Sequence, residues 1–205
     1  AWSEQRSSRL NQRERQRWHQ LNRLADSDRN GTTTADEAFQ GDAVALLQAA
    51  NIPLIDDTED GSSGSGLMHQ KFLVIDQTIV ITGSANLTRS GLHGDADRPS
   101  SRGNVNHLLR VNSPELALVF RQEFTQMWGH GPGSKQDSRF GLQKAKGSVQ
   151  TVKVGDIRMD VLFSPHPRRD SNHGLNLLAE QLKPAKKSLD MALFVFSAQQ
   201  LTNVL

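Results

Sequence analysis

A histidine and a lysine lie two residues apart in one apolar stretch, and their side chains are well suited to phosphate chemistry. The stretch Met68–Ile75 is rich in residues that favour strands, and it contains His69 and Lys71. Because side chains alternate along a strand, these two would project from the same face, about 7 Å apart along the chain. An ammonium group can neutralise a phosphate while an imidazole attacks phosphorus. The spacing therefore predicts a phosphate site.

The residues that follow supply a partner strand and further polar groups. A second apolar run, Thr78–Thr82, comes after Asp76-Gln77, which predicts a hairpin with a tight turn. Ser84 and Asn86 follow this second strand, where a short helix is expected to begin. A hydroxyl, an amide and helix N–H groups all suit phosphate oxygens. The alternative is a half-buried hairpin whose surface histidine and lysine are incidental.

The complete pattern is H-x-K-x4-D followed by G-S-x-N, and it resembles the phospholipase D superfamily. Six positions agree over the 18 residues from His69 to Asn86. Some members carry a glutamate that orients the catalytic histidine, whereas this chain has Asn104-Val105-Asn106 in that neighbourhood. The six positions that carry the resemblance are His69, Lys71, Asp76, Gly83, Ser84 and Asn86.

The resemblance implies a two-step displacement at phosphorus. His69 would form a phosphohistidine, while a second histidine would protonate the leaving oxygen and then activate water. Lys71, Ser84 and Asn86 would stabilise the charged oxygens, and Asp76, the third residue of the motif, is expected to order the site. The resemblance implies no metal for catalysis. The second half-site would come from residues beyond Leu205 or from a second copy of the chain.

A second motif precedes the histidine region. Asp26 to Glu37 fits D-x-D-x-N-G-x5-E without a gap and resembles an EF-hand calcium loop. The position that normally carries an aliphatic residue is Thr33, which favours modest affinity. The expected cofactor is a structural Ca²⁺, and the alternative is a polar loop without an ion. The expected ligands are Asp26, Asp28, Asn30, Thr32 through its carbonyl, and Glu37, with Thr34 near the ion.

Composition excludes several classes of site. The chain has 205 residues, a net charge of +2 and no cysteine, so thiolate chemistry and cysteine-based zinc sites are excluded. A pI near 9.2 is only mildly basic and does not by itself indicate a nucleic-acid binder. No apolar run reaches about 18 residues and no signal peptide is visible, so the sequence predicts no spanning segment and leaves the compartment open.

The order of elements predicts an α/β fold, with a phospholipase D-like mixed sheet flanked by helices. One repeat is nearly complete, and a second is expected to be truncated after a buried strand at Ser188–Phe196. An arginine-rich helix is expected at Trp2–Ala25, and an acidic, glycine-rich loop at Asp56–Gly66. The expected division is residues 1–50 for a helix, the EF-hand-like loop and a helix, 51–129 for the first repeat, 130–155 for a linker, and 156–205 for the start of the second repeat.

Together these observations predict a phosphodiesterase that forms a phosphohistidine, with phospholipid favoured as substrate by analogy with two-repeat relatives. The first alternative is a nuclease of the same superfamily, which would use the arginines of the first helix. The second alternative is a calcium-dependent binding module without activity. The intact motif argues against this last possibility.

Overall fold

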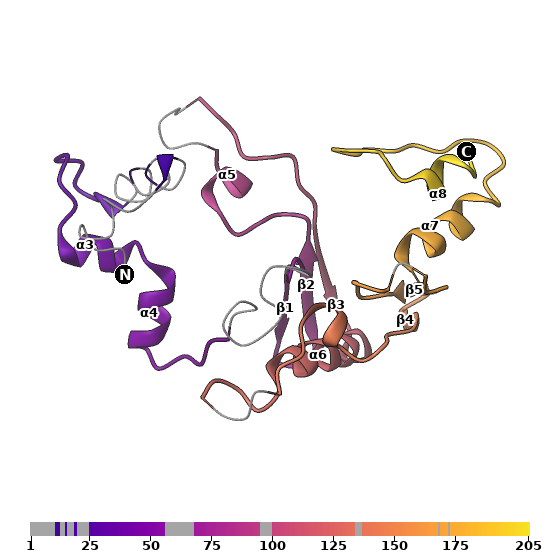
Figure 1. Cartoon of the computed structure of the whole chain (residues 1–205), viewed down its shortest axis with the longest axis horizontal. Coiled ribbons are helices and arrows are strands. Elements are labelled where there is room, and N and C mark those ends of the chain that lie inside the picture. Colours follow the sequence, from indigo (N-terminus) through magenta and orange to yellow (C-terminus); the bar gives the residue numbers. More distant parts are fainter. Residues whose placement is uncertain are drawn as a thin grey trace. The chain divides into compact units, whose positions relative to one another are not determined.

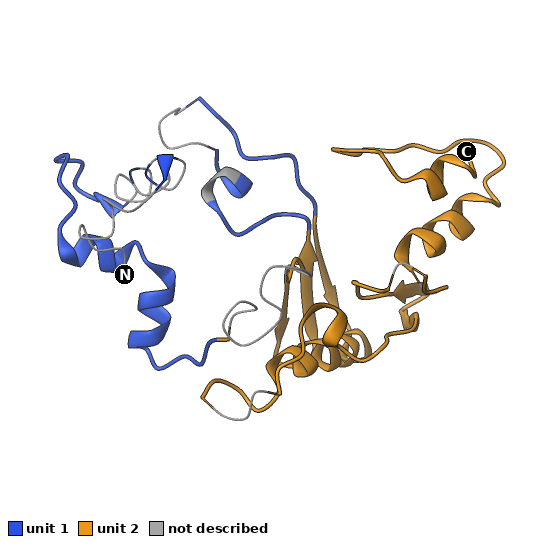
Figure 2. Ribbon diagram, viewed as in Figure 1, with its two compact units in different colours: residues 1–54, 84–107 blue, residues 55–83, 108–205 orange. Residues whose placement is uncertain are grey.

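The chain divides into two compact units in a computed structural model. One unit comprises residues 1–54 and 84–107, and the other comprises residues 55–83 and 108–205 (Figure 2). The residues described are 11, 12, 15, 19, 25–55, 68–94, 100–133, 137–167, 169–171 and 173–205. The predicted loop Asp56–Gly66 and most of the predicted helix Trp2–Ala25 lie outside them.

A three-stranded antiparallel sheet forms the centre of the second unit. Its strands are β1 (Phe72–Ile75), β2 (Ile79–Gly83) and β3 (Leu108–Asn112), in the order β1-β2-β3 (Figure 1). The predicted turn between β1 and β2 is confirmed. Asp76 and Gln77 have φ angles of 49° and 58°, and three residues, Asp76 to Thr78, separate the paired residues Ile75 and Ile79.

Helix α6 (Pro114–Trp128) packs against this sheet and contacts β1 and β2. Ser113 caps the start of this helix: its Oγ accepts a hydrogen bond from Leu116 N at 3.1 Å, and Pro114 occupies the first turn. The helix buries one face because apolar side chains recur on it at helical spacing. The buried core cluster comprises Val80, Leu116, Ala117 and Phe120.

Three phenylalanines join the sheet, the helix and a later segment. The rings of Phe72 and Phe163 each pack against Phe120, with centroids 5.1 Å apart and nearly perpendicular planes. Edge-to-face pairs of this kind add about 0.5–1.5 kcal/mol to the burial of the rings. The core therefore depends on residues that lie far apart in the sequence.

A second hairpin follows the 3-10 turn η1 (Gly141–Gln143). It consists of β4 (Gln150–Val154) and β5 (Ile157–Val161), paired antiparallel around Gly155. The sequence prediction placed β4 in a linker. Helix α6 contacts β4, so this hairpin belongs to the second unit. Helices α7 (Gly174–Leu182) and α8 (Gln199–Thr202) complete the described chain.

The predicted buried strand at Ser188–Phe196 is wrong. These residues form no strand, and their apolar side chains are exposed, including Phe194 at 102%. The α/β class and the packing of a helix on a sheet are confirmed, and all described strand pairs are antiparallel. None of the helices found in the described ranges is both long and apolar enough to cross a membrane.

The described residues of the first unit include the short helices α3 (Ala35–Gln40), α4 (Ala43–Ala49) and α5 (Arg89–Leu92). The single helix predicted after the EF-hand-like loop is divided at Gly41-Asp42 into α3 and α4. Asp42 explains the break because its side chain accepts hydrogen bonds from Val44 N and Ala45 N and so caps α4.

Candidate functional site

The segment that carries His69 and Lys71 lies immediately before β1. The prediction placed both within a strand, whereas the strand begins at Phe72. His69 is exposed and Lys71 is half-buried. The Lys71 ammonium donates a hydrogen bond to the His69 carbonyl oxygen at 2.5 Å. An ammonium has three N–H donors, so two are left for an anion.

His69 lines a cavity of about 190 Å³ in the second unit. Cavities that enclose drug-sized ligands measure roughly 300–1,000 Å³, so this one suits a phosphate and a small attached group. Its wall combines apolar and polar side chains from the histidine segment, from α6 and from later segments. The lining residues are Met68, His69, Gln70, Met127, Gly141, Lys144, Ser164 and Pro165.

A buried polar network borders the cavity. Gln70 Nε2 donates to Glu123 Oε1 at 2.7 Å, and Lys144 forms an ion pair with the same carboxylate. Lys144 Nζ also donates to the Ser164 carbonyl oxygen at 2.8 Å. The sequence prediction did not include this network. One signal was available: Glu123 occupies the buried face of α6, where a carboxylate needs a partner.

Asp76 lies at the hairpin turn, as predicted. It is exposed, and it lies five positions after Lys71, at the other end of β1, which corresponds to roughly 16 Å of strand. This distance fits a role in shaping the hairpin and does not fit direct contact with a group bound at His69.

Ser84 and Asn86 follow the last residue of β2, and both are exposed. The Ser84 hydroxyl donates to Asn106 Oδ1 at 2.8 Å and accepts from His107 N at 3.1 Å. Asn106 Nδ2 donates to the carbonyls of Gly91 and Asn104. To donate to a phosphate, the Ser84 hydroxyl would therefore have to give up its hydrogen bond to Asn106. The helix expected at Asn86 begins later, at Arg89.

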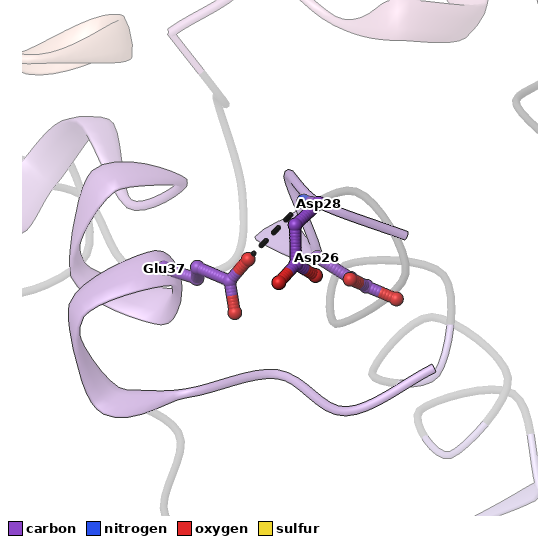
Figure 3. A group of neighbouring side chains, drawn as sticks. All are labelled: Asp26, Asp28 and Glu37. Carbon is purple, nitrogen blue, oxygen red and sulfur yellow. Dashed lines mark hydrogen bonds between the residues drawn. The ribbon is translucent and has the colours of Figure 1, made fainter. Parts of the chain in front are cut away.

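The EF-hand-like loop brings its acidic residues together. Carboxylate oxygens of Asp26, Asp28 and Glu37 all lie within 4.8 Å of one another (Figure 3). Ca²⁺–oxygen distances are about 2.3–2.6 Å, so two oxygens on one ion can lie up to about 5 Å apart. The donor set therefore fits a calcium ion.

Backbone hydrogen bonds fold this loop around its first aspartate. Asn30 N and Gly31 N donate to the two oxygens of Asp26, at 3.1 and 2.9 Å. Gly31 has a φ of 86°, a conformation that glycine adopts without the steric cost of a side chain. Thr32 N donates to Asn30 Oδ1 at 2.8 Å. All five predicted ligand residues thus belong to one folded loop.

Glu37 is held in its charged form. Hydrogen bonds from the Thr34 backbone, the Ser27 hydroxyl and the Thr34 hydroxyl lower its pKa to about 2. Thr34 and Glu37 also form the capping box that begins α3. The carboxylate is therefore ionised at any ordinary pH, as a metal ligand must be.

The fold and the site define a class of α/β protein in which a histidine and a lysine precede a hairpin backed by a helix. A family model described as "Cardiolipin synthase, PLD-like domain" matches residues 11–128. Since this match covers more than half of the sequence, the chain belongs to the phospholipase D-like family. No solved structure matches the chain.

Curated relatives agree with this assignment. The chain is 29% identical over 91 residues to proteins named mitochondrial cardiolipin hydrolase from Mus musculus and Homo sapiens, and an equal identity is found for the Xenopus tropicalis protein. The match covers 44% of this chain and 35%, 31% and 37% of those proteins. The chain thus spans about a third of the length of the relatives it matches.

Proposed function

We propose that the chain provides one catalytic half-site of a phospholipase D-type phosphodiesterase that acts on phospholipids. The observation that carries this proposal is that His69, in a segment matched by the family model, is exposed and lines a cavity of about 190 Å³. The relatives are named for the hydrolysis of cardiolipin, a phospholipid, which favours a lipid over a nucleic-acid substrate.

The reaction would begin with attack by an imidazole nitrogen of His69 on phosphorus. The bond from phosphorus to the leaving alcohol breaks, and a phosphohistidine forms. The Lys71 ammonium stabilises charge on the phosphoryl oxygens. Water then cleaves the phosphorus–nitrogen bond, which releases the phosphate monoester and the free imidazole.

A second histidine must protonate the leaving oxygen and then remove a proton from water. His69 is the chain's single histidine in an H-x-K sequence. The proposal therefore assigns the second half-site to another such motif, supplied by a second copy or by further chain of the same protein.

Turnover and a covalent intermediate test this proposal. Phosphatidic acid release from cardiolipin vesicles, followed by mass spectrometry, should be abolished by His69→Ala and unaffected by His93→Ala, a substitution at an exposed histidine. Rapid acid-free quenching should trap phosphate on His69. Cleavage of single-stranded DNA without lipid turnover would favour the nuclease alternative, and unchanged lipid turnover in His69→Ala would refute the assigned nucleophile.

We also propose that the Asp26–Glu37 loop binds Ca²⁺ in a structural role. The clustering of three carboxylates within 4.8 Å supports this proposal. Asp26, Asp28 and Glu37 would supply carboxylate oxygens, Asn30 its amide oxygen and Thr32 its carbonyl. Glu37 Oε1 accepts hydrogen bonds from Ser27 N, Ser27 Oγ and Asp28 N. A bound ion would replace some of these donors.

Calorimetry tests the ion site. Calcium should release or absorb heat on binding to the wild-type chain, and Glu37→Gln should remove that signal. Asp36→Asn is a matched control because Asp36 is the neighbouring acid and lies outside the cluster. An equal signal in the wild type and Glu37→Gln would rule out the loop as the calcium site.

A further inference from the structure

An ion pair is buried at the wall of the cavity that His69 lines. The side chains of Glu123 and Lys144 are only 5% and 7% exposed. Burying two charges costs free energy that their mutual attraction often fails to recover. A pair in this position therefore calls for an explanation beyond stability.

The contacts of the pair lead directly to the histidine–lysine segment. Glu123 Oε1 accepts a hydrogen bond from Gln70 Nε2 at 2.7 Å, and Gln70 is the residue between His69 and Lys71. The amide orientation is defined because a carboxylate can only accept. Residues 70 and 123 are 53 positions apart in sequence, so α6 holds this segment through a tertiary contact.

The segment needs such a contact because it lies outside the strand ladder. The pairing of β1 with β2 begins at Phe72. Thr82 Oγ1 donates to the Lys71 carbonyl at 3.0 Å, which ties down the residue next to the strand. Gln70 is the next point of attachment toward His69.

Lys144 extends the network beyond the part of the chain that the family model matches. It binds Glu123 from a segment after Trp128, and it donates to the Ser164 carbonyl at 2.8 Å. The carboxylate that holds Gln70 is thereby fixed from two sides.

We infer that Glu123 and Lys144 are positioning residues: through Gln70 they hold His69 where it can attack a phosphodiester bound in the cavity. This inference rests on the proposed function. It extends the functional unit to residues 144 and 164, beyond the matched region of 11–128.

Steady-state kinetics on bis(4-nitrophenyl) phosphate tests the inference in the full chain. Glu123→Gln and Lys144→Met should lower kcat by about 10- to 100-fold, because a misplacement near 1 Å can cost about 100-fold. KM should stay unchanged in Glu123→Gln, because Glu123 is not among the residues that line the cavity. Glu180→Gln and Lys183→Met, which disrupt an exposed ion pair of the same residue types, should leave both constants unchanged.

Two variants separate positioning from loss of stability or charge. Val80→Ala weakens the core without touching Gln70 and should leave kcat unchanged at temperatures where it is folded. The double variant Glu123→Lys with Lys144→Glu rebuilds the ion pair but places a carboxylate against the Ser164 carbonyl, so kcat should stay low. Full kcat in this double variant, or an equal loss in Val80→Ala, would overturn the inference.

A second readout does not depend on turnover. Diethyl pyrocarbonate modifies accessible imidazoles, and mass spectrometry gives the rate at His69 relative to exposed His107 in the same molecule. Folded Glu123→Gln and Lys144→Met should change this ratio, whereas Glu180→Gln should not. Absence of turnover in every form when the second half-site is supplied would refute the proposed function alone, and an unchanged ratio in folded variants would refute the positioning role.

Discussion

Two apolar segments of the second unit have similar composition and different structures. The hairpin from Phe72 to Gly83 is paired along its length, and Val80 within it is fully buried. The segment Ser188–Phe196 is also mostly apolar and ends in the β-forming residues Phe194, Val195 and Phe196, yet Leu193, Phe194 and Val195 are 58%, 102% and 67% exposed. The hairpin carries its own partner strand across a connection of three residues, Asp76 to Thr78. Strand propensity therefore produces a strand only where a neighbouring backbone satisfies the N–H and C=O groups.

Hydrogen exchange should show the largest contrast between these segments. Amides of β1 and β2 should exchange only on global unfolding, which costs about 5–15 kcal/mol in a typical domain. Amides of residues 189–196 should exchange with protection near zero. Strong protection of 189–196 in the isolated chain would mean that this segment has a backbone partner, and the comparison would fail.

Removing one phenylalanine from the core under the hairpin and one from Ser188–Phe196 should show the next largest difference. Phe120→Ala deletes a ring from the core beneath the hairpin and should lower the free energy of unfolding by about 4 kcal/mol. Phe194→Ala removes an exposed ring and should change it by less than about 0.5 kcal/mol. Urea unfolding of both variants measures the difference. Similar losses would show that Phe194 is buried in solution.

The third largest difference in stability is expected for the buried ion pair of Glu123 and Lys144. Lys144→Met leaves Glu123 as an uncompensated buried charge and should destabilise the chain by about 3 kcal/mol. Lys183→Met removes a lysine from an exposed pair and should cost less than about 1 kcal/mol. Thermal unfolding of the two variants compares them, and a stable Lys144→Met protein would indicate that solvent reaches the pair.

The smallest effect should come from the hairpin turn. Gln77 has a φ of 58°, so Gln77→Gly relieves a strained conformation and should stabilise the chain by about 0.5 kcal/mol. Asn112→Gly, the same kind of change in the extended strand β3, should instead destabilise it by a similar amount. Denaturant midpoints compare the two variants. A loss of stability in Gln77→Gly would mean that the hydrogen bond from Arg121 to the Gln77 side chain stabilises the chain more than the strained φ destabilises it.

Local signals predicted the elements that form within one stretch of chain. The turn at Asp76-Gln77 and the calcium-type loop each depend on residues within about a dozen positions, so a single sequence contains the information. The confirmed position of the turn follows from this locality.

Long-range features were not predictable in the same way. The bond from Gln70 to Glu123 joins residues 53 positions apart, and only the tertiary fold brings them together. The prediction placed β4 in a linker, although Val152 and Val154 alternate with polar residues next to Gly155. The prediction of a buried strand at Ser188–Phe196 was wrong for the opposite reason. The apolar composition of this segment indicated burial, but no described part of the chain covers it.

The ring of Phe163 has a practical consequence for shortened versions of this protein. It packs on Phe120 beneath the hairpin, although it lies 35 positions after the end of the family match at Trp128. A protein trimmed at that boundary would expose the faces of Phe72 and Phe120 to water. Expression of the matched region alone should therefore yield aggregates, and domain limits for this chain should be chosen by its aromatic packing.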